Sequence, residues 1–163
     1  MKIKIFTTGG SLDKGYSTRE STFLVQDPQI GEVLDQANVA FDYEVEPLFR
    51  KDSLEITEED RELILRKVTE DAADHILITH GTDTMALTGR RLSQVEGKTI
   101  VLTGAMQPAS FKQTDAHFNI GFALAALLTL PHGVYLAMNG SIFDPHQVRK
   151  NMALDRFEAE ATS

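Results

Sequence analysis

The chain has 163 residues, of which 42% are hydrophobic and 25% are charged, and it contains no cysteine. This length leaves room for one folded core and excludes two domains of ordinary size, so we expect residues 1–163 to form a single domain. The formal net charge of -8, without a Lys/Arg cluster, disfavours nucleic acid as a partner, and the lack of cysteine excludes disulfides and thiolate chemistry.

The first elements expected are an apolar strand that ends at Gly9-Gly10-Ser11 and a polar loop, residues 13–26, that closes into a small hairpin. A helix follows, with Asp27 as its expected cap and Pro28 as its first residue, because proline suits that position. Residues 39–48 alternate apolar and polar side chains and predict a strand.

The rest of the chain alternates helices and strands. Thr57 and the acids after it predict the start of a helix that runs to about Ala73. The later elements expected are a strand at 75–80, a helix from about Thr82 to Gln94, a strand at 99–103, a helix from about Asp115 to Leu130 and a strand at 133–138. This order predicts an α/β fold with an open, mostly parallel twisted sheet and helices on both faces.

The helix at 115–130 is apolar nearly all round, which predicts cover on more than one side and makes a subunit contact one candidate for that cover. The apolar run from Ile120 to Leu130 is nevertheless shorter than the roughly 20 residues that span a bilayer. The alternating Lys2-Ile3-Lys4-Ile5 start is unlike a secretory signal. We therefore expect a cytoplasmic protein with no membrane partner.

Three apolar strands end in small turns that contain glycine and hydroxyl-bearing residues: Thr8-Gly9-Gly10-Ser11, His80-Gly81-Thr82-Asp83-Thr84 and Thr103-Gly104-Ala105. Ligands of open parallel sheets bind outside the carboxyl ends of the strands, where the strand order reverses. Glycine lets the backbone come close to a ligand. The three turns therefore predict one active-site crevice at the carboxyl ends of the strands.

Amide or ester cleavage without a metal or a cysteine needs a hydroxyl nucleophile, a proton acceptor and backbone donors. Ser11 is a candidate nucleophile, although a Gly-Gly-Ser segment also serves as a plain turn. Thr82 and Asp83 either cap a helix or belong to the site. Lys150 is either a solvated surface charge or a base whose pKa is lowered by burial or by a neighbouring positive charge.

Two kinds of site are disfavoured by spacing. The five histidines are scattered, with no pair at helix-face ligand spacing, so we expect no metal. The turn at Gly9-Gly10 lacks the glycine spacing of a dinucleotide-binding loop, which leaves nucleotide binding as a poorly supported hypothesis. We expect no cofactor.

Several motifs together resemble the bacterial-type L-asparaginases: Thr8-Gly9-Gly10-Ser11, Asp52-Ser53, His80-Gly81-Thr82-Asp83-Thr84-Met85, Thr103-Gly104-Ala105-Met106-Gln107-Pro108 and Lys150, in this order. The resemblance runs through nearly the whole chain. It implies hydrolysis of L-asparagine to L-aspartate and ammonia through an acyl-enzyme in a homo-oligomer, a dimer or a tetramer. L-Glutamine is a second candidate substrate.

The resemblance also implies roles for individual residues. Ser11 corresponds to the nucleophile and Tyr16 to a mobile-loop tyrosine, while Thr82, Asp83 and Lys150 correspond to a Thr-Lys-Asp set. Asp83 would also bind the substrate's α-amino group, Ser53 its α-carboxylate, and the Ala105 backbone its side-chain amide. The substrate-binding set implied is Gly10, Ser53, Gly81, Thr82, Asp83 and Ala105.

Two departures from the family pattern stand out. The family usually has threonine where this chain has Ser11, and serine lacks the branched carbon that restricts threonine's χ1. Family members usually carry a second, smaller domain, so the sequence resembles either a short single-domain member or a truncated chain. An alternative hypothesis is an amino-acid sensor that keeps the pocket with little or no catalysis.

Overall fold

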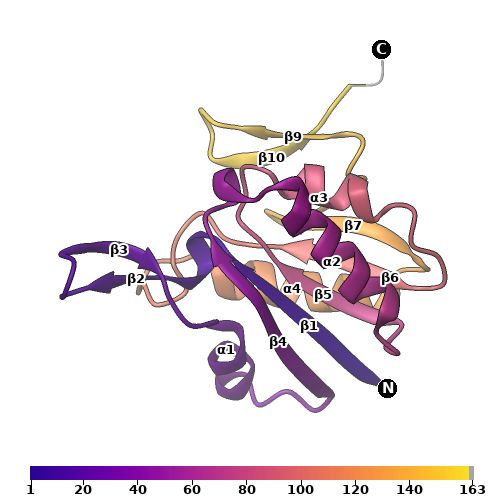
Figure 1. Ribbon diagram of the computed structural model, residues 1–163, viewed down its shortest axis with the longest axis horizontal. Coiled ribbons are helices and arrows are strands. Elements are labelled where there is room, and N and C mark those ends of the chain that lie inside the picture. Colours follow the sequence, from indigo (N-terminus) through magenta and orange to yellow (C-terminus); the bar gives the residue numbers. More distant parts are fainter. Residues whose placement is uncertain (162–163) are drawn as a thin grey trace.

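The computed structural model describes residues 1–161 and contains a central six-stranded sheet in the order β4-β1-β5-β6-β7-β8 (Figure 1). Its strands are β1 (Lys2–Gly9), β4 (Asp42–Lys51), β5 (His75–Thr79), β6 (Thr99–Thr103), β7 (Gly133–Met138) and β8 (Ser141–Phe143). All neighbouring pairs are parallel except β7 and β8, which are antiparallel. The expected open, mostly parallel α/β sheet is confirmed.

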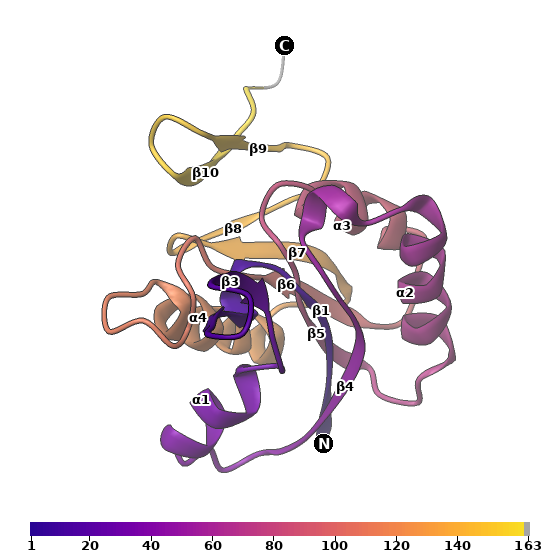
Figure 2. The same cartoon turned by 60° about the vertical axis from the view of Figure 1, so that its left-hand side comes forward.

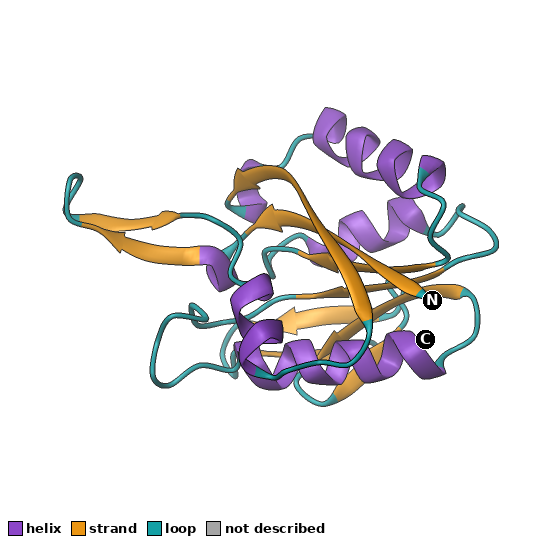
Figure 3. Cartoon of the chain, turned by 90° about the horizontal axis from the view of Figure 1, so that it is seen from below, coloured by secondary structure: helices purple, strands orange, loops and turns teal. Residues whose placement is uncertain are grey.

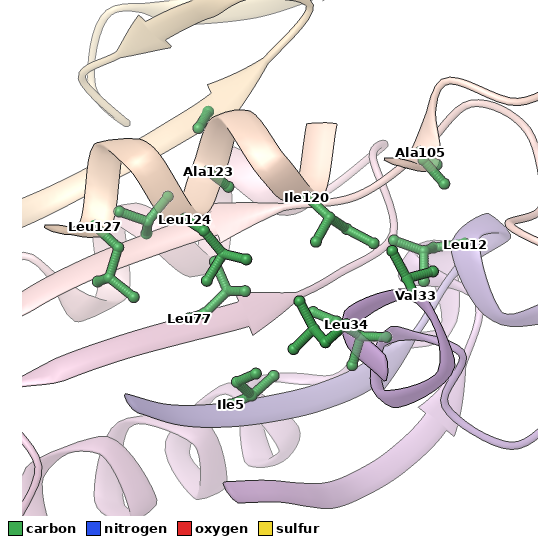
Figure 4. Close-up of a cluster of buried hydrophobic side chains, with 14 of the residues drawn as sticks. Ile5, Leu12, Val33, Leu34, Leu77, Ala105, Ile120, Ala123, Leu124 and Leu127 are labelled. Carbon is green, nitrogen blue, oxygen red and sulfur yellow. The ribbon is translucent and has the colours of Figure 1, made fainter. Parts of the chain in front are cut away.

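Helices cover both faces of this sheet. Helices α1 (Ile30–Gln36) and α4 (Ala116–Thr129) lie on one face, and α2 (Glu58–Glu70) and α3 (Met85–Leu92) lie on the other (Figures 2 and 3). Figure 4 shows Ile5 and Leu77 of the sheet beneath Ile120 and Leu124 of α4. Burial of one such side chain stabilises the fold by roughly 1.5–3 kcal/mol, so the apolar strand runs follow from cover on both faces.

Two hairpins lie outside the six-stranded sheet. The first pairs β2 (Lys14–Ser17) with β3 (Thr22–Val25) and confirms the hairpin expected within residues 13–26. The second pairs β9 (Val148–Asn151) with β10 (Arg156–Ala159) and was not expected from the sequence. In Figure 1 the β2–β3 hairpin projects to the left of the sheet and the β9–β10 hairpin lies above it.

The prediction for the start of α1 was wrong. Asp27 forms an ion pair with Arg50 instead of capping the helix, and Gln29 stands at the N-cap. The Gln29 N–H donates to Asp13 Oδ1 at 2.9 Å, so a residue distant in sequence satisfies this helix end. Asp13 is buried, and this burial raises the pKa of its carboxyl to about 7.

The expected start of α2 is confirmed by a capping box between Thr57 and Asp60, although the helix ends at Glu70 rather than near residue 73. Strand β4 starts at Asp42 and reaches Lys51, about three residues later than expected. Among residues 1–161, no helix is both long enough and apolar enough to cross a membrane.

Strand β1 fixes the place where the chain changes direction across the sheet. Its neighbours are β4 on one side and β5 on the other, so the crossovers that follow β1 and β4 lead to opposite sides of β1. Thr7 of β1 is in register with Thr79 of β5, which brings the ends of these two strands together. The switch point of the sheet therefore lies where the sequence predicted the crevice.

Candidate active site

The turns after β1 and β5 are in direct backbone contact. Gly10 has φ +80°, and its N–H donates to the Lys51 carbonyl at 3.0 Å. A Cβ at Gly10 would lie 2.5 Å from Gly81 Cα, closer than two carbon atoms can approach. The first turn therefore needs glycine both for its conformation and for its contact with the second turn.

The second turn rests on Ser53 of the 3-10 segment η2 (Ser53–Glu55). The Asp83 N–H donates to Ser53 Oγ at 3.1 Å, and Thr84 Oγ1 donates to the Ser53 carbonyl at 2.8 Å. These bonds hold residues 82–84 outside the helix, so α3 begins at Met85 rather than near residue 82. Ser53 is only 1% exposed, and its hydroxyl supports the turn from below.

Lys150 reaches this turn from β9. Its Nζ donates to Thr82 Oγ1 and to Asp83 Oδ1, each at 2.8 Å. The side chains of Lys150 and Asp83 are 15% and 30% exposed, so the ion pair lies at the rim between protein and solvent. Because Thr82 Oγ1 accepts from the lysine, the Thr82 hydroxyl proton is left to point toward another acceptor.

A buried histidine fixes the backbone behind Thr82. His80 is 1% exposed, with Nδ1 2.7 Å from the Gly81 carbonyl and Nε2 2.7 Å from Thr88 Oγ1. A carbonyl only accepts, so Nδ1 carries the proton, and Nε2 accepts from the Thr88 hydroxyl, which accepts from Arg61 Nε at 3.2 Å. Burial lowers the pKa of His80 to about 4, which keeps the ring neutral at pH 7.

The third turn, after β6, is held by side chains of its own loop and of α4. Met106 N–H and Gln107 N–H donate to the Asp115 carboxylate, with shortest distances of 2.9 and 3.0 Å. Asn119 Nδ2 donates to the Gly104 carbonyl at 3.0 Å. Ala105 is 1% exposed and lies near Leu12, the residue after Ser11 (Figure 4).

Ser11 and Tyr16 follow the first turn. Ser11 begins the 3-10 segment η1 (Ser11–Asp13) and is partly exposed. Tyr16 lies on β2, is 55% exposed and packs its ring edge-to-face on Phe23, with centroids 5.4 Å apart. Within residues 1–161, the Tyr16 hydroxyl makes no hydrogen bond to Thr82, Asp83 or Lys150. The catalytic role expected of Tyr16 therefore stays a prediction.

The β2–β3 hairpin is nevertheless tied to the site. Lys14 Nζ pairs with Asp52 Oδ2 at 2.9 Å, directly before Ser53. The hydrogen bond from Lys14 holds the pKa of Asp52 below its usual value. The structure thus brings Gly10, Ser53, Gly81, Thr82, Asp83 and Lys150 together, and it connects the hairpin that carries Tyr16 to the same turn.

A cavity of about 550 Å³ lies at the opposite end of the sheet and is lined in part by Lys4, Glu44 and Asp71. Lys4 is already paired with Glu44 Oε1 at 2.8 Å and with Glu46 Oε2 at 2.7 Å. Paired charges offer little to a ligand, so chemistry favours the strand-end turns over this larger space. Within residues 1–161, no group of three or more His, Asp or Glu side chains is placed to hold a metal ion.

The comparisons with known proteins agree with the placement of these turns. Residues 2–162 match the family described as "Asparaginase, N-terminal". The chain belongs to this family. It is 30% identical over 175 residues to the L-asparaginase of Thermococcus kodakarensis, an alignment that covers 98% of this chain and 51% of the relative.

Solved structures of the family share this fold. The T. kodakarensis L-asparaginase gives a TM-score of 0.83 at 29% identity and covers 98% of this chain and 51% of its own. L-asparaginase I from Vibrio cholerae gives 0.84 at 25% identity and covers 97% and 51%. The chain spans about half the length of these asparaginases.

Another relative is named for a different overall reaction. A segment of 82 residues is 40% identical to part of a glutamyl-tRNA(Gln) amidotransferase of Methanococcus vannielii, and it covers 49% of this chain and 19% of the relative. The family assignment therefore leaves the reaction of this chain to be argued from its site.

Two supports of the site were not anticipated from the sequence. His80 lies within the second turn motif, where sequence assigned it no role, and its position between an apolar strand and Gly81 was the available signal. Asn119 belongs to an apolar helix, and only its polarity at a position facing the core distinguished it.

Proposed function

We propose that the chain hydrolyses the side-chain amide of L-asparagine to L-aspartate and ammonia through an acyl-enzyme on Ser11. The observation that carries the proposal is the contact of Lys150 Nζ with Thr82 Oγ1 and Asp83 Oδ1, at 2.8 Å each, beside the turn that leads into Ser11. A hydroxyl, an amine and a carboxylate within hydrogen-bond reach are a standard means of moving protons for a hydroxyl nucleophile.

The reaction has two steps. In the first, Ser11 Oγ forms a bond to the carboxamide carbon, the C–N bond breaks, and the serine proton leaves with the nitrogen as ammonia. In the second, water adds to the ester, the Oγ–C bond breaks and Oγ regains a proton. We assign proton transfer in both steps to the Thr82 hydroxyl and Lys150, with Asp83 orienting the lysine.

The other end of the substrate meets complementary groups. The Asp83 carboxylate has a second oxygen beyond the one that accepts from Lys150, and an ammonium group would pair with it. Ser53 Oγ accepts from the Asp83 N–H, so its own proton is available to a carboxylate once the turn opens around the substrate. The Ala105 backbone would receive the side-chain amide. Tyr16 would reach the site from the β2–β3 hairpin.

The test is ammonia release from L-asparagine, with L-glutamine as a parallel substrate because one methylene changes binding by only about 1–3 kcal/mol. We expect Ser11→Ala and Lys150→Ala each to lower turnover by about 10³-fold or more. Lys112→Ala, at an exposed lysine on another loop, is the matched control and should keep wild-type turnover. Wild-type turnover in both site variants would contradict the proposal.

The alternative is an amino-acid sensor, and the half-length match to the asparaginases keeps it open. Calorimetry separates the two functions. Tight binding of asparagine or aspartate without ammonia release would favour the sensor, whereas binding with turnover favours the enzyme. No change in melting temperature with ATP or NAD would dispose of the nucleotide-binding hypothesis.

The proposal includes a homo-oligomer that forms through α4. Phe118 is 61% exposed and stacks on Phe122 with ring centroids 6.1 Å apart, beside an apolar groove between α1 and α4 lined in part by Val33 and Leu124. Helix α4 carries no Asp, Glu, Lys or Arg. Two copies that each carry a charge of -8 would associate through such an uncharged face, with the ridge of one copy in the groove of the other.

Sedimentation or light scattering tests this contact. We expect a particle of at least twice the 18.1 kDa chain mass, and we expect Phe118→Glu to shift it toward the single-chain mass. Leu87→Glu on α3, where the side chain is 47% exposed, is the control and should leave the mass unchanged. A wild-type monomer, or an unchanged Phe118→Glu oligomer, would overturn the contact.

We also propose a cytoplasmic location. One structural relative, at 26% identity and a TM-score of 0.74, is described as a probable cytoplasmic L-asparaginase from Campylobacter jejuni. Cell fractionation tests the location, and recovery of the protein outside the cytoplasm would contradict it.

A further inference from the structure

Lys150 is the only one of the proposed proton-transfer residues that does not follow a strand of the central sheet directly. It lies on β9, whose partner in the structure is β10, and Lys150 is paired with Phe157. Paired residues of an antiparallel ladder place their side chains on the same face. Phe157 is 5% exposed within the core of the α2–α3 side, so Lys150 also lies on the inward face of this hairpin.

The Phe157 N–H points away from β9. It donates to Asn139 Oδ1 at 2.9 Å rather than to the paired strand, as expected at a non-hydrogen-bonded pair. At such a pair the two Cα atoms are only about 4.5 Å apart. A bond that fixes Phe157 therefore also fixes the backbone of Lys150.

Asn139 connects this hairpin to the sheet. It follows β7 directly and has φ 55°, in the left-handed region that asparagine tolerates better than most residues. Its N–H donates to Asn119 Oδ1 at 3.2 Å. The backbone and the side chain of Asn139 thus bind two different parts of the molecule.

Asn119 continues the connection to the third turn. It is 1% exposed, and its Nδ2 donates to the Gly104 carbonyl at 3.0 Å and to Asp115 Oδ2 at 3.1 Å. Gly104 precedes Ala105, the residue proposed to offer backbone to the substrate amide. An unbroken set of hydrogen bonds thus runs from the Gly104–Ala105 turn through two asparagines to the strand opposite Lys150.

We propose that Asn119 and Asn139 are positioning residues that hold Lys150 at Thr82 and Asp83 by fixing the β9–β10 hairpin against the Gly104–Ala105 turn. The placement of Lys150 stands on the geometry alone, and only its kinetic consequence rests on the proposed function. Neither asparagine touches the reacting groups, so each acts through Lys150.

The competing explanation is that Asn139 is present only because the turn needs a residue with positive φ. Glycine satisfies that need equally well but provides no acceptor for Phe157. Aspartate keeps the acceptor and is among the residues that tolerate positive φ. Asn139→Gly and Asn139→Asp therefore separate the hydrogen bond from the backbone conformation, and Asn139 is exposed enough for both chains to fold.

The first readout is the rate at which an amine-acylating reagent modifies Lys150, followed by peptide mass spectrometry. We expect Asn139→Gly to raise this rate about tenfold, in line with the loss of one buried hydrogen bond, and Asn139→Asp to stay within about twofold of wild type. Lys112, exposed on another loop, is the internal control and should react equally in all three chains.

The second readout is the kinetics of ammonia release. Asn139→Gly should lower kcat by about tenfold with little change in KM, because Lys150 moves protons and does not hold the substrate, and Asn139→Asp should restore kcat. Wild-type Lys150 labelling in Asn139→Gly, or equal losses in both variants, would overturn the proposal. A wild-type chain without ammonia release would refute the proposed function, and the labelling would still decide the positioning role.

Discussion

The turns after β1 and β5 and the β9–β10 hairpin contribute to the same candidate site, but they are held in place differently. The turns interlock through backbone atoms, with Gly10 and Gly81 packed too closely to admit a side chain. The hairpin lies outside the six-stranded sheet, and the Phe157 side chain together with the bond to Asn139 anchors it. We infer that the site has one half whose geometry is set by the sheet and one half whose geometry depends on a few contacts.

The sharpest way to break the sheet-borne half is Gly81→Ala. The added Cβ would lie 2.6 Å from Ser53 Cβ and 2.9 Å from Ser53 Oγ, in a region that is fully packed. We expect a loss of about 3 kcal/mol in the free energy of unfolding, at the upper end of the usual cost of overpacking. Urea unfolding measures it, with Asn139→Gly as the hairpin counterpart. An equal or larger loss in Asn139→Gly would reverse the comparison.

The second prediction concerns His80, which supports Gly81 from within the core. An unfolded chain binds a proton at His80 near its ordinary pKa of 6.5, whereas the folded chain does so only near 4, so His80 makes folding less favourable as pH falls between these values. Relative to His80→Gln, the wild type should lose about 2 kcal/mol of stability between pH 7 and pH 5.

The comparison with His80→Gln is needed because Asp13 acts in the opposite direction. Its pKa is raised from 3.8 to about 7, so the stability that it contributes at low pH is lost as pH rises through this range. Both chains contain Asp13, and its contribution cancels in their difference. Parallel pH profiles for the two chains would show that His80 is not the titrating group.

A smaller effect is expected at the floor of the site. The Oγ1 atom of Thr79 is buried and has no hydrogen-bond partner within the described residues 1–161. Thr79→Val should therefore stabilise the fold by about 1 kcal/mol, because it removes an unpaired hydroxyl. The matched control is Thr103→Val, which should destabilise by about 1 kcal/mol, since Thr103 Oγ1 donates to the Ala137 carbonyl at 2.8 Å. Destabilisation in both variants would indicate that Thr79 has a partner.

The sheet and its strand-end turns could be predicted from local sequence because each strand is a short apolar run that ends at glycine. Thr57 also marked its helix correctly, since its capping partner, Asp60, is three residues away. The start of α1 could not be predicted in this way, because the group that satisfies the Gln29 N–H is Asp13, sixteen residues earlier. Local pattern therefore sufficed where the partner was near in sequence.

The β9–β10 hairpin illustrates the same limit within the site. Its strands have four residues each, and the inward side of β9 carries Val148 and Lys150, which gives a weak alternation of apolar and polar residues. Its anchor, Asn139, belongs to a turn after β7. Lys150 could be proposed from the family resemblance, but the contacts that place it depend on residues that meet only in the folded chain.

The most direct test of the account is a crystal structure of Ser11→Ala with L-asparagine bound. The account predicts the carboxamide carbon about 3.5 Å or less from the site of the missing Ser11 oxygen, the substrate ammonium on Asp83, and Lys150 still bonded to Thr82. Asparagine bound at another place, bound in the reverse orientation, or not bound at all would contradict it.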